Sequence, residues 1–362
     1  MTTTTAADLS PSSAKPRGRT NIIRLLVIVI LALGVLIWFG AFKPKPRVAM
    51  VAGESPYFEL IISGAKEAAR QYDVDLTVVR ARGDAQADAI RGLVGQKYDG
   101  VAVSPFNPSG EAALLSQLAS ETTLVTFDSD TPLSNRLCFV GTDNYFAGRL
   151  CGQQVRQAIP DGGEVIISTG SLDKENGQRR RQGLIDELLD RPIQPDRDMD
   201  AVDQPQPGQK YSVVATLIDV GSPEGIVEKV MSTIKEHPNV KCVVGLNNYS
   251  APRAVLALQK AGKLDQIKIV GFDADKDTLA GIEDGHIAAS ILQDQYGTGF
   301  HAVRILAENA RGDKSGLPMF HRRTLPVEVI NKDNVTSVRE QLGGGSTGGG
   351  APAPAPATVA AQ

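Results

Sequence analysis

Short apolar runs alternate with helix-like segments between residues 47 and 340. The runs are rich in Val and Ile, as is typical of parallel strands that helices cover on both faces. Between them, apolar positions recur at helical spacing; in residues 59–72, Leu60, Ile61 and Ala65 share one face. This alternation predicts parallel sheets with right-handed crossovers. We expect strands at 48–52, 76–80, 101–103, 124–127, 138–140, 165–167, 213–218, 240–246, 267–272 and 287–292, and helices that include 59–72, 111–119, 145–159, 179–189, 224–235, 252–261 and 298–310.

Two stretches depart from this alternation. Residues 124–127 and 138–140 follow one another without a helix between them, so we interpret the second run as the chain crossing into another domain. Residues 191–210 are rich in Pro and Asp and lack periodicity, which predicts a surface insertion between a helix and a strand.

Several apolar runs end in a small polar residue. These residues are Ser104, Asp128, Ser168, Asn247 and Asp273. In open α/β sheets, ligands bind in the crevice outside the carboxyl ends of the strands. The pattern therefore predicts a polar small-molecule site for a hydroxyl-rich ligand.

The two ends of the chain differ from the region between them. Residues 25–42 carry no charge, and with Ile22 and Ile23 the segment 22–42 is long enough to cross ~30 Å of hydrocarbon as a helix. We expect an N-terminal membrane anchor, with a cleaved signal peptide as the alternative. Residues 1–21 form a basic tail, and the Gly- and Ala-Pro-rich residues 343–362 cannot build a core.

Composition and charge exclude some partners. The net charge is −3, and residues after the basic tail are acidic overall, whereas nucleic-acid binding needs clustered Lys and Arg. We expect no nucleic-acid partner. Of the three cysteines, Cys138 and Cys242 lie in apolar runs, where buried free thiols are expected.

The motifs of several enzyme classes are absent from the sequence. There is no G-x-G-x-x-G after a strand, no phosphate-binding G-x-x-x-x-G-K-[ST] and no G-x-S-x-G nucleophile motif. The four histidines show no metal-ligand spacing. We therefore expect a binding protein without catalytic residues, metal or cofactor.

Candidate ligand residues lie at the predicted crevice. Tyr57 and Phe58 open the first helix, where aromatic rings either stack on the C–H faces of a sugar or belong to the core. Asp128 either accepts hydrogen bonds from two adjacent hydroxyls or caps a turn. In the run Arg179–Arg180–Arg181 we expect two side chains to face solvent and one to enter the cleft. An amide such as Gln293 both donates and accepts, which matches a hydroxyl.

At this point the sequence resembles the type I periplasmic sugar-binding proteins of the ribose/galactose group. The resemblance covers residues 47–340 and rests on ordered motifs: PYF at 56–58, VTFDSD at 125–130, VGTDNYFAGR at 140–149, NGQRRRQG at 176–183, GLNNYSAPRAVLALQKAGK at 245–263, IVGFD at 269–273 and IAASILQ at 287–293. It implies an α/β fold of two Rossmann-like lobes with parallel sheets, joined by a three-strand hinge. We expect the first lobe at 47–141 plus 294–322 and the second at 142–293 plus 323–340.

The resemblance also implies roles for individual residues. Tyr57 and Phe58 match the stacking aromatics, Asp128 the hydroxyl-binding aspartate, and Arg180 the arginine of the cleft. Asn247, Phe272, Asp273 and Gln293 match ligand residues of the second lobe and hinge, and Asp143 and Asn144 fall at the first crossing. Two positions depart from ribose binders: Ser129 stands where an arginine is common, and Ser104 where an asparagine is expected. These differences favour another monosaccharide or a cyclitol over ribose.

The function implied is capture of a sugar by hinge closure and delivery to the permease of an ABC importer. The alternative is a sensor that presents the closed lobes to a membrane kinase. We expect a monomer on the periplasmic side, tethered to the inner membrane by residues 22–42 or, if these are cleaved, soluble in the periplasm.

Overall fold

The computed structural model describes residues 17–38, 44–219 and 223–344. Residues up to Lys45 and residues from Pro46 onward form two separate compact units, and α1 (Arg17–Trp38) belongs to the first. Among the described helices, none is both long and apolar enough to cross a membrane. The predicted anchor at 22–42 is not supported by this finding. Its residues 39–42 lie outside the described residues, as do most of the predicted basic tail and residues 345–362.

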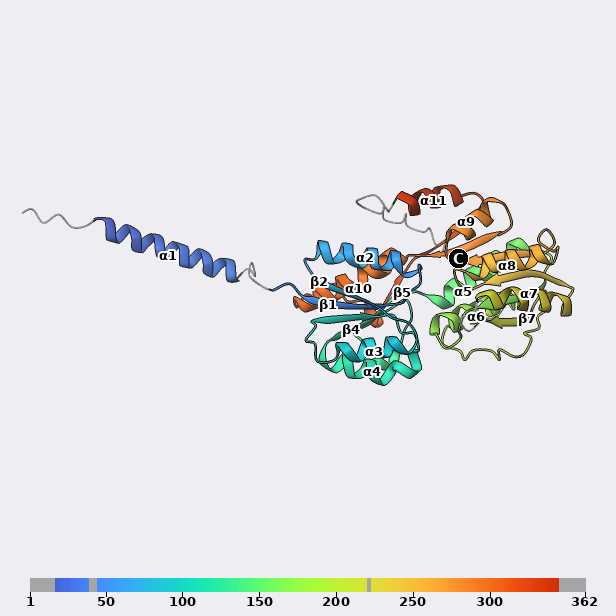
Figure 1. Ribbon diagram of the computed structural model, residues 1–362, viewed down its shortest axis with the longest axis horizontal. Helices are drawn as coiled ribbons and strands as arrows, with labels where there is room; N and C mark the ends of the chain where they lie inside the picture. The colour runs from blue at the N-terminus through green and yellow to red at the C-terminus, as the bar shows by residue number, and fades with distance from the viewer. Residues whose placement is uncertain (1–16, 39–43, 220–222, 345–362) are drawn as a thin grey trace, which may run out of the picture. The chain divides into compact units, whose positions relative to one another are not determined.

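The second unit contains two six-stranded sheets, whose strand orders correspond position by position. Each sheet lies in one of two lobes (Figure 1). The first sheet has the order β11-β5-β4-β3-β1-β2 and consists of β1 (Arg47–Ala52), β2 (Asp75–Arg80), β3 (Gly100–Val103), β4 (Thr123–Phe127), β5 (Cys138–Thr142) and β11 (Arg322–Leu325). The second has the order β12-β10-β9-β8-β6-β7 and consists of β6 (Gly163–Thr169), β7 (Tyr211–Ile218), β8 (Val240–Gly245), β9 (Lys268–Phe272), β10 (Ala289–Gln293) and β12 (Val327–Asn331). All pairings are parallel except that of β12 with β10.

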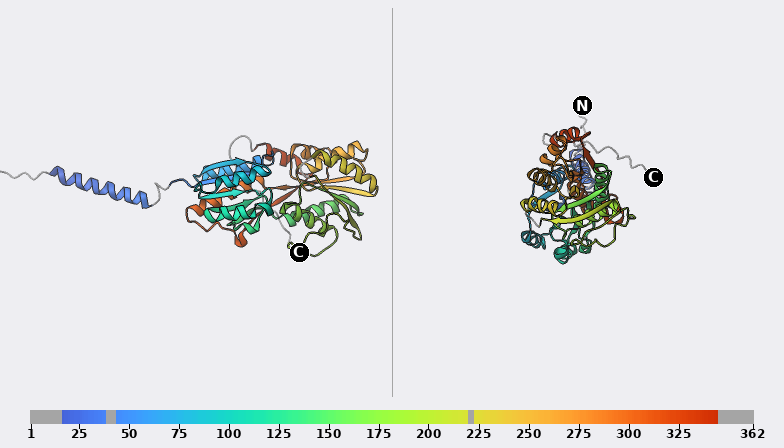
Figure 2. Two further views of the ribbon diagram at one scale, coloured as in Figure 1. Left: turned by 60° about the horizontal axis from the view of Figure 1, so that its bottom comes forward. Right: turned by 90° about the vertical axis from the view of Figure 1, so that its right-hand side faces the viewer.

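Helices cover both faces of each sheet (Figures 1 and 2). The first lobe contains α2 (Phe58–Gln71), α3 (Asp84–Leu93), α4 (Pro108–Glu121) and α10 (Gln295–Ala310). The second contains α5 (Asn144–Ala158), α6 (Glu175–Leu188), α7 (Pro223–Glu236), α8 (Ser250–Lys260), α9 (Lys276–Glu283) and α11 (Val335–Gly344). The helix after β5 packs on α6 of the second lobe, and the helix after β10 packs on α2 of the first. The lobes thus exchange one helix each.

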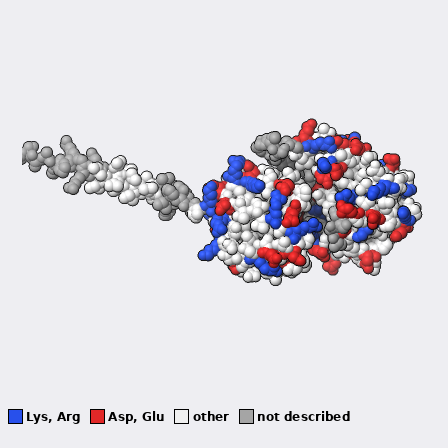
Figure 3. Space-filling model, in the orientation of Figure 1, with Lys and Arg blue, Asp and Glu red and all other residues white. Residues whose placement is uncertain are grey.

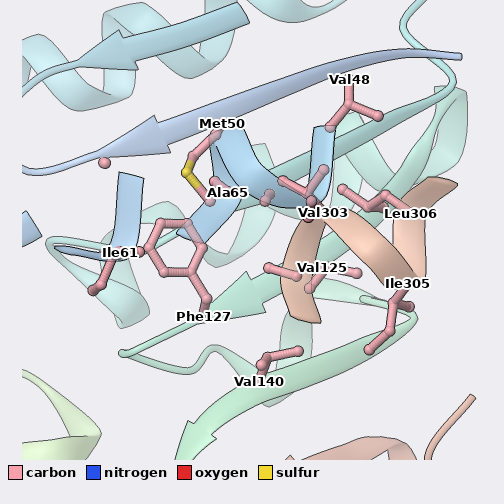
Figure 4. Close-up of a cluster of buried hydrophobic side chains, with 14 of the residues drawn as sticks. Val48, Met50, Ile61, Ala65, Val125, Phe127, Val140, Val303, Ile305 and Leu306 are labelled. Atoms are coloured by element: carbon pink, nitrogen blue, oxygen red, sulfur yellow. The ribbon is translucent and has the colours of Figure 1, made fainter. Parts of the chain in front are cut away.

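The buried strands explain the unbroken apolar runs. Val48 and Met50 of β1 face the core beneath α2 and α10, together with Phe127 (Figure 4). Ala49 and Val51 of the same strand face α3 and α4 on the other side of the sheet. Because both faces are covered, the five positions of the strand after the exposed Arg47 are all apolar.

The chain crosses between the lobes three times, after β5, after β10 and after β11. The interpretation of residues 138–140 as the crossing is wrong, because β5 pairs with β4 inside the first sheet and the chain leaves only at its end. The third crossing falls at Pro326, since β11 still pairs with β5 as far as Leu325. The boundary after residue 322 was therefore placed too early.

Residues 191–210 form an insertion without helix or strand, and arginines of α6 hold it in place. The Arg181 side chain is fully buried and donates to the backbone oxygens of Asp200 (2.8 Å) and Ala201 (2.9 Å). Arg179 donates to the backbone oxygen of Arg197 (3.0 Å). The prediction that two of the three neighbouring arginines face solvent is wrong for Arg181, which is fully buried. The Arg179 side chain is 30% exposed and contacts the insertion as well.

Candidate functional site

Asp128 and Asp273 occupy corresponding positions in the two lobes. Asp128 follows β4 and donates its N–H to Val140 of β5 (3.1 Å), and Asp273 follows β9 and donates its N–H to Ile291 of β10 (2.8 Å). Both have a positive φ, 61° and 65°, a conformation that few residues other than Gly adopt and that Asp tolerates. Both side chains are buried. The fold therefore brings one carboxylate from each lobe to the sheet edges.

Tyr57 and Gln293 link the two carboxylates by hydrogen bonds. The Tyr57 hydroxyl donates to Asp128 Oδ1 (2.7 Å), and Gln293 Nε2 donates to Asp273 Oδ1 (2.8 Å) and to the Tyr57 hydroxyl (3.3 Å). Ser104 Oγ donates to Asp128 Oδ2 (3.2 Å). Tyr57 and Ser104 lie on the first lobe, Asp273 lies on the second, and Gln293 ends β10 at a crossing. The cluster consequently spans both lobes and the hinge.

Arg180 completes the cluster from the second lobe. Its guanidinium donates to Asn144 Oδ1 (2.9 Å), to the backbone oxygen of Leu246 (3.1 Å) and to Gln293 Oε1 (2.6 Å). It also lies over the Phe272 ring, 4.1 Å from its centroid. These contacts involve neutral groups only, and three of the five N–H donors of a guanidinium suffice for them. The remaining donors are free for a ligand.

Burial raises the pKa of two side chains of the cluster, Asp273 and Tyr57. It raises the pKa of Asp273 to about 6, against the favourable effects of Arg180 and of the hydrogen bond from Gln293. Nearby Asp128 and Asp275 raise this pKa further. The pKa of Tyr57 is also raised, first by burial and then by the two aspartates, so its hydroxyl stays protonated. The cluster combines carboxylate acceptors with neutral and cationic donors, which is the chemistry that binds hydroxyl groups.

Three sequence candidates lie outside this cluster. Phe58 belongs to the core of the first lobe, where it packs beneath the sheet and touches Tyr57 edge-on at 5.2 Å between centroids. Asn247 Oδ1 accepts from the backbone N–H (3.1 Å) and the hydroxyl of Ser250, so it holds the turn that leads into α8. Ser168 is buried, and its Oγ has no hydrogen-bond partner within the described part of the chain.

Thr142 is a member of the cluster that the sequence analysis did not single out. Its hydroxyl donates to Gln293 Oε1 (2.8 Å). Thr142 and Gln293 end β5 and β10, which lead into the first two crossings, and the next residues, Asp143 and Asp294, cap α5 and α10 in the same way. The repeated pattern of a strand end followed by a capping Asp was the signal that could have identified Thr142.

The comparison with protein families agrees with this geometry. A family profile described as a periplasmic binding protein domain matches residues 47–314. The chain is a type I periplasmic binding protein. This assignment agrees with the expectation of a binding protein rather than an enzyme, since the relatives described next are named as binding proteins.

Individual relatives cover most of this periplasmic binding protein. The ribose import binding protein of Salmonella typhimurium is 23% identical over 278 residues, which is 75% of this chain and 86% of the relative. A glucose-galactose binding protein from Geobacillus stearothermophilus has a similar structure, with a TM-score of 0.71, 25% identity and coverage of 81% and 99% of the two chains. An ABC transporter solute-binding protein from Burkholderia graminis, in complex with D-arabinose, has a TM-score of 0.70 and 26% identity. The match covers 82% of this chain and 98% of that protein.

Proposed function

We propose that this protein captures a monosaccharide or cyclitol between its two lobes and delivers it to the permease of an ABC importer. The observation that carries the proposal is the hydrogen-bonded cluster of Asp128, Tyr57, Gln293 and Asp273, with Arg180 beside it. Carboxylates on opposite lobes accept from different hydroxyls of one ligand, while Arg180 donates to a ring or hydroxyl oxygen. The names of the relatives, which bind ribose, glucose, galactose or arabinose, support the same ligand class.

The mechanism follows from the division of the cluster between the lobes. A ligand touches Asp128 and Asp273 together only when the lobes are closed, so it stabilises the closed state by that difference in affinity. Moving the population from 1:99 to 99:1 requires about 5.5 kcal/mol. A few charge-assisted hydrogen bonds of about 1.5–3 kcal/mol each are sufficient. The permease then binds the closed form, which requires the lobes to lie on the extracytoplasmic side.

A thermal-shift screen tests the proposal. Purified protein is heated with D-ribose, D-galactose, D-glucose, D-arabinose, L-arabinose and myo-inositol, and positives are measured by calorimetry. We expect at least one of these ligands to raise the melting temperature and to bind with a stoichiometry of one per chain. The proposal is wrong if no carbohydrate of a broad panel binds. Uptake of the labelled ligand by cells with and without the gene then separates delivery from the signalling role considered above.

A further inference from the structure

Lys174 reaches from the second lobe to the first. It immediately precedes α6, in extended backbone conformation (φ −91°, ψ 138°), six positions before Arg180 along the chain. Its ammonium lies over the ring of Phe106, 5.3 Å from the centroid. Phe106 belongs to the loop between β3 and α4 of the first lobe. This cation–π contact therefore joins the lobes outside the three connecting segments.

The loop that carries Phe106 is fixed to the candidate site. The Phe106 N–H donates to Gln86 Oε1 (2.6 Å), and Gln86 Nε2 donates to the backbone oxygen of Ser104 (3.1 Å). Gln86 is buried, and Ser104 in turn bonds Asp128. The Phe106 ring is thus held in place two residues along the chain from Ser104, which belongs to the cluster.

Charged groups of both lobes act on the Lys174 ammonium. Burial lowers its pKa, Asp128 and Glu111 of the first lobe favour its charged form, and Arg82 and Arg180 oppose it. In the described residues, the ammonium forms neither a hydrogen bond nor an ion pair. Its three N–H donors are therefore available to a ligand. Figure 3 shows acidic and basic side chains interspersed over one face of the two lobes.

We propose that Lys174 is a specificity-determining residue that contacts the ligand and holds the lobes closed. This proposal rests on the proposed function. The Lys174 ammonium donates to one oxygen of the ligand, and the hydroxyl on the neighbouring carbon donates to Asp128. The site then selects ligands that present two adjacent oxygens to this pair. The contact with Phe106 makes the ammonium part of the closed state, because it exists only when the lobes meet.

Affinity measurements on matched variants provide the first test. Lys174→Met keeps the aliphatic stem and removes the charge; Lys174→Arg keeps a cation over the ring. Lys210→Met is the control, because Lys210 lies over Tyr211 (5.8 Å) entirely within the second lobe. With whichever of D-ribose, D-galactose, D-arabinose or myo-inositol binds best, we expect K174M to weaken binding about three- to ten-fold and K210M to have no effect. K174R should retain most of the affinity. Equal affinities of K174M and the wild type overturn the assignment.

Distances between the lobes, measured without ligand, test the closing contact separately from sugar binding. Spin labels are attached to Lys66→Cys on α2 and Lys235→Cys on α7, both exposed, while the three native thiols are buried. We expect the K174M background to populate longer distances between lobes than the wild type, and the K210M background not to. F106L should have the same effect as K174M, and the double variant no more than either. If no sugar binds but K174M opens the lobes, the proposed ligand class fails and the closing contact stands; unchanged distances refute the closing contact.

Discussion

Asp273 should make both stability and binding depend on pH. Its pKa is raised from 3.8 to about 6, so the folded state holds the proton more tightly than the unfolded state does. The free energy of unfolding then falls as the pH rises from about 4 to above 6, by on the order of 3 kcal/mol for this group. Asp273→Asn should remove that part of the pH dependence in urea titrations. Ligand affinity should rise with pH through about 6, because the ionised carboxylate accepts ligand hydroxyls.

Individual residues of the site differ in how far the sequence determines them. Strand ends and motifs predict Asp128, Asp273, Arg180 and Gln293, and the structure brings their side chains together. The same motif predicts both Tyr57 and Phe58 beside a ligand. The Tyr57 hydroxyl joins the cluster, whereas the Phe58 side chain packs in the core of the first lobe, and its contact with a ligand stays a prediction. Sequence position alone does not decide which of two adjacent aromatic residues faces the crevice.

Substitutions of the neighbouring residues Arg180 and Arg181 should affect different properties, ligand binding for the first and stability for the second. Arg180→Lys loses the planar set of donors to Asn144, Leu246 and Gln293, and we expect at least ten-fold weaker ligand binding with a small change in melting temperature. Arg181→Lys should instead lower the stability, by about 1–3 kcal/mol, because buried backbone oxygens of the insertion lose their donors. Calorimetry and thermal unfolding of both variants check this. Equal losses of affinity in the two would contradict the assignment.

At the scale of elements, most strands and long helices follow from apolar periodicity. The predicted strands agree with the structure within a few residues, because strands buried on both faces have an unmistakable composition. The elements that were not predicted are α3, α9, α11, β11 and β12. Helix α9 is short, and α3 (DAQADAIRGL) has only two large apolar residues, Ile90 and Leu93. Strands β11 and β12 are recognisable only from their pairing partners, which lie far away in the sequence.

Glycines allow the exchanged helices to approach closely. A Cβ at Gly299 of α10 would lie 1.7 Å from the backbone oxygen of Ile61 in α2, and one at Gly183 of α6 would lie 2.0 Å from that of Tyr145 in α5. Gly299→Ala should therefore lower the free energy of unfolding by about 1–3 kcal/mol. Gly92→Ala in α3 is the control, since nothing lies within 4 Å of that position and Ala favours a helix by up to about 1 kcal/mol. Chemical denaturation of both variants measures the difference, and similar effects would show that the helix contact is looser than the structure indicates.

At the scale of the whole molecule, the exchange of α5 and α10 ties the two lobes together. Each lobe needs a helix that follows a strand of the other lobe, so neither lobe is one continuous piece of chain. If one lobe unfolds, the helix that it holds, which follows a strand of the other lobe, loses its packing. The crossing at which Thr142 and Gln293 meet then becomes looser. We therefore expect residues 46–344 to unfold as one cooperative unit rather than lobe by lobe.

The three native thiols report this cooperativity without any mutation. Cys138 lies in the first sheet, and Cys151 and Cys242 lie in the second lobe, all of them buried and free. Burial raises the pKa of Cys138 and Cys151 to about 12, so in the native state they remain protonated and react slowly with alkylating reagents. Pulsed alkylation at increasing urea concentration, analysed by mass spectrometry, should give one common midpoint for all three residues. A bound sugar should shift that midpoint equally for each, because it contacts both lobes. A lower midpoint for Cys138 than for the other two would mean that the lobes unfold separately and that the exchanged helices contribute little to the coupling.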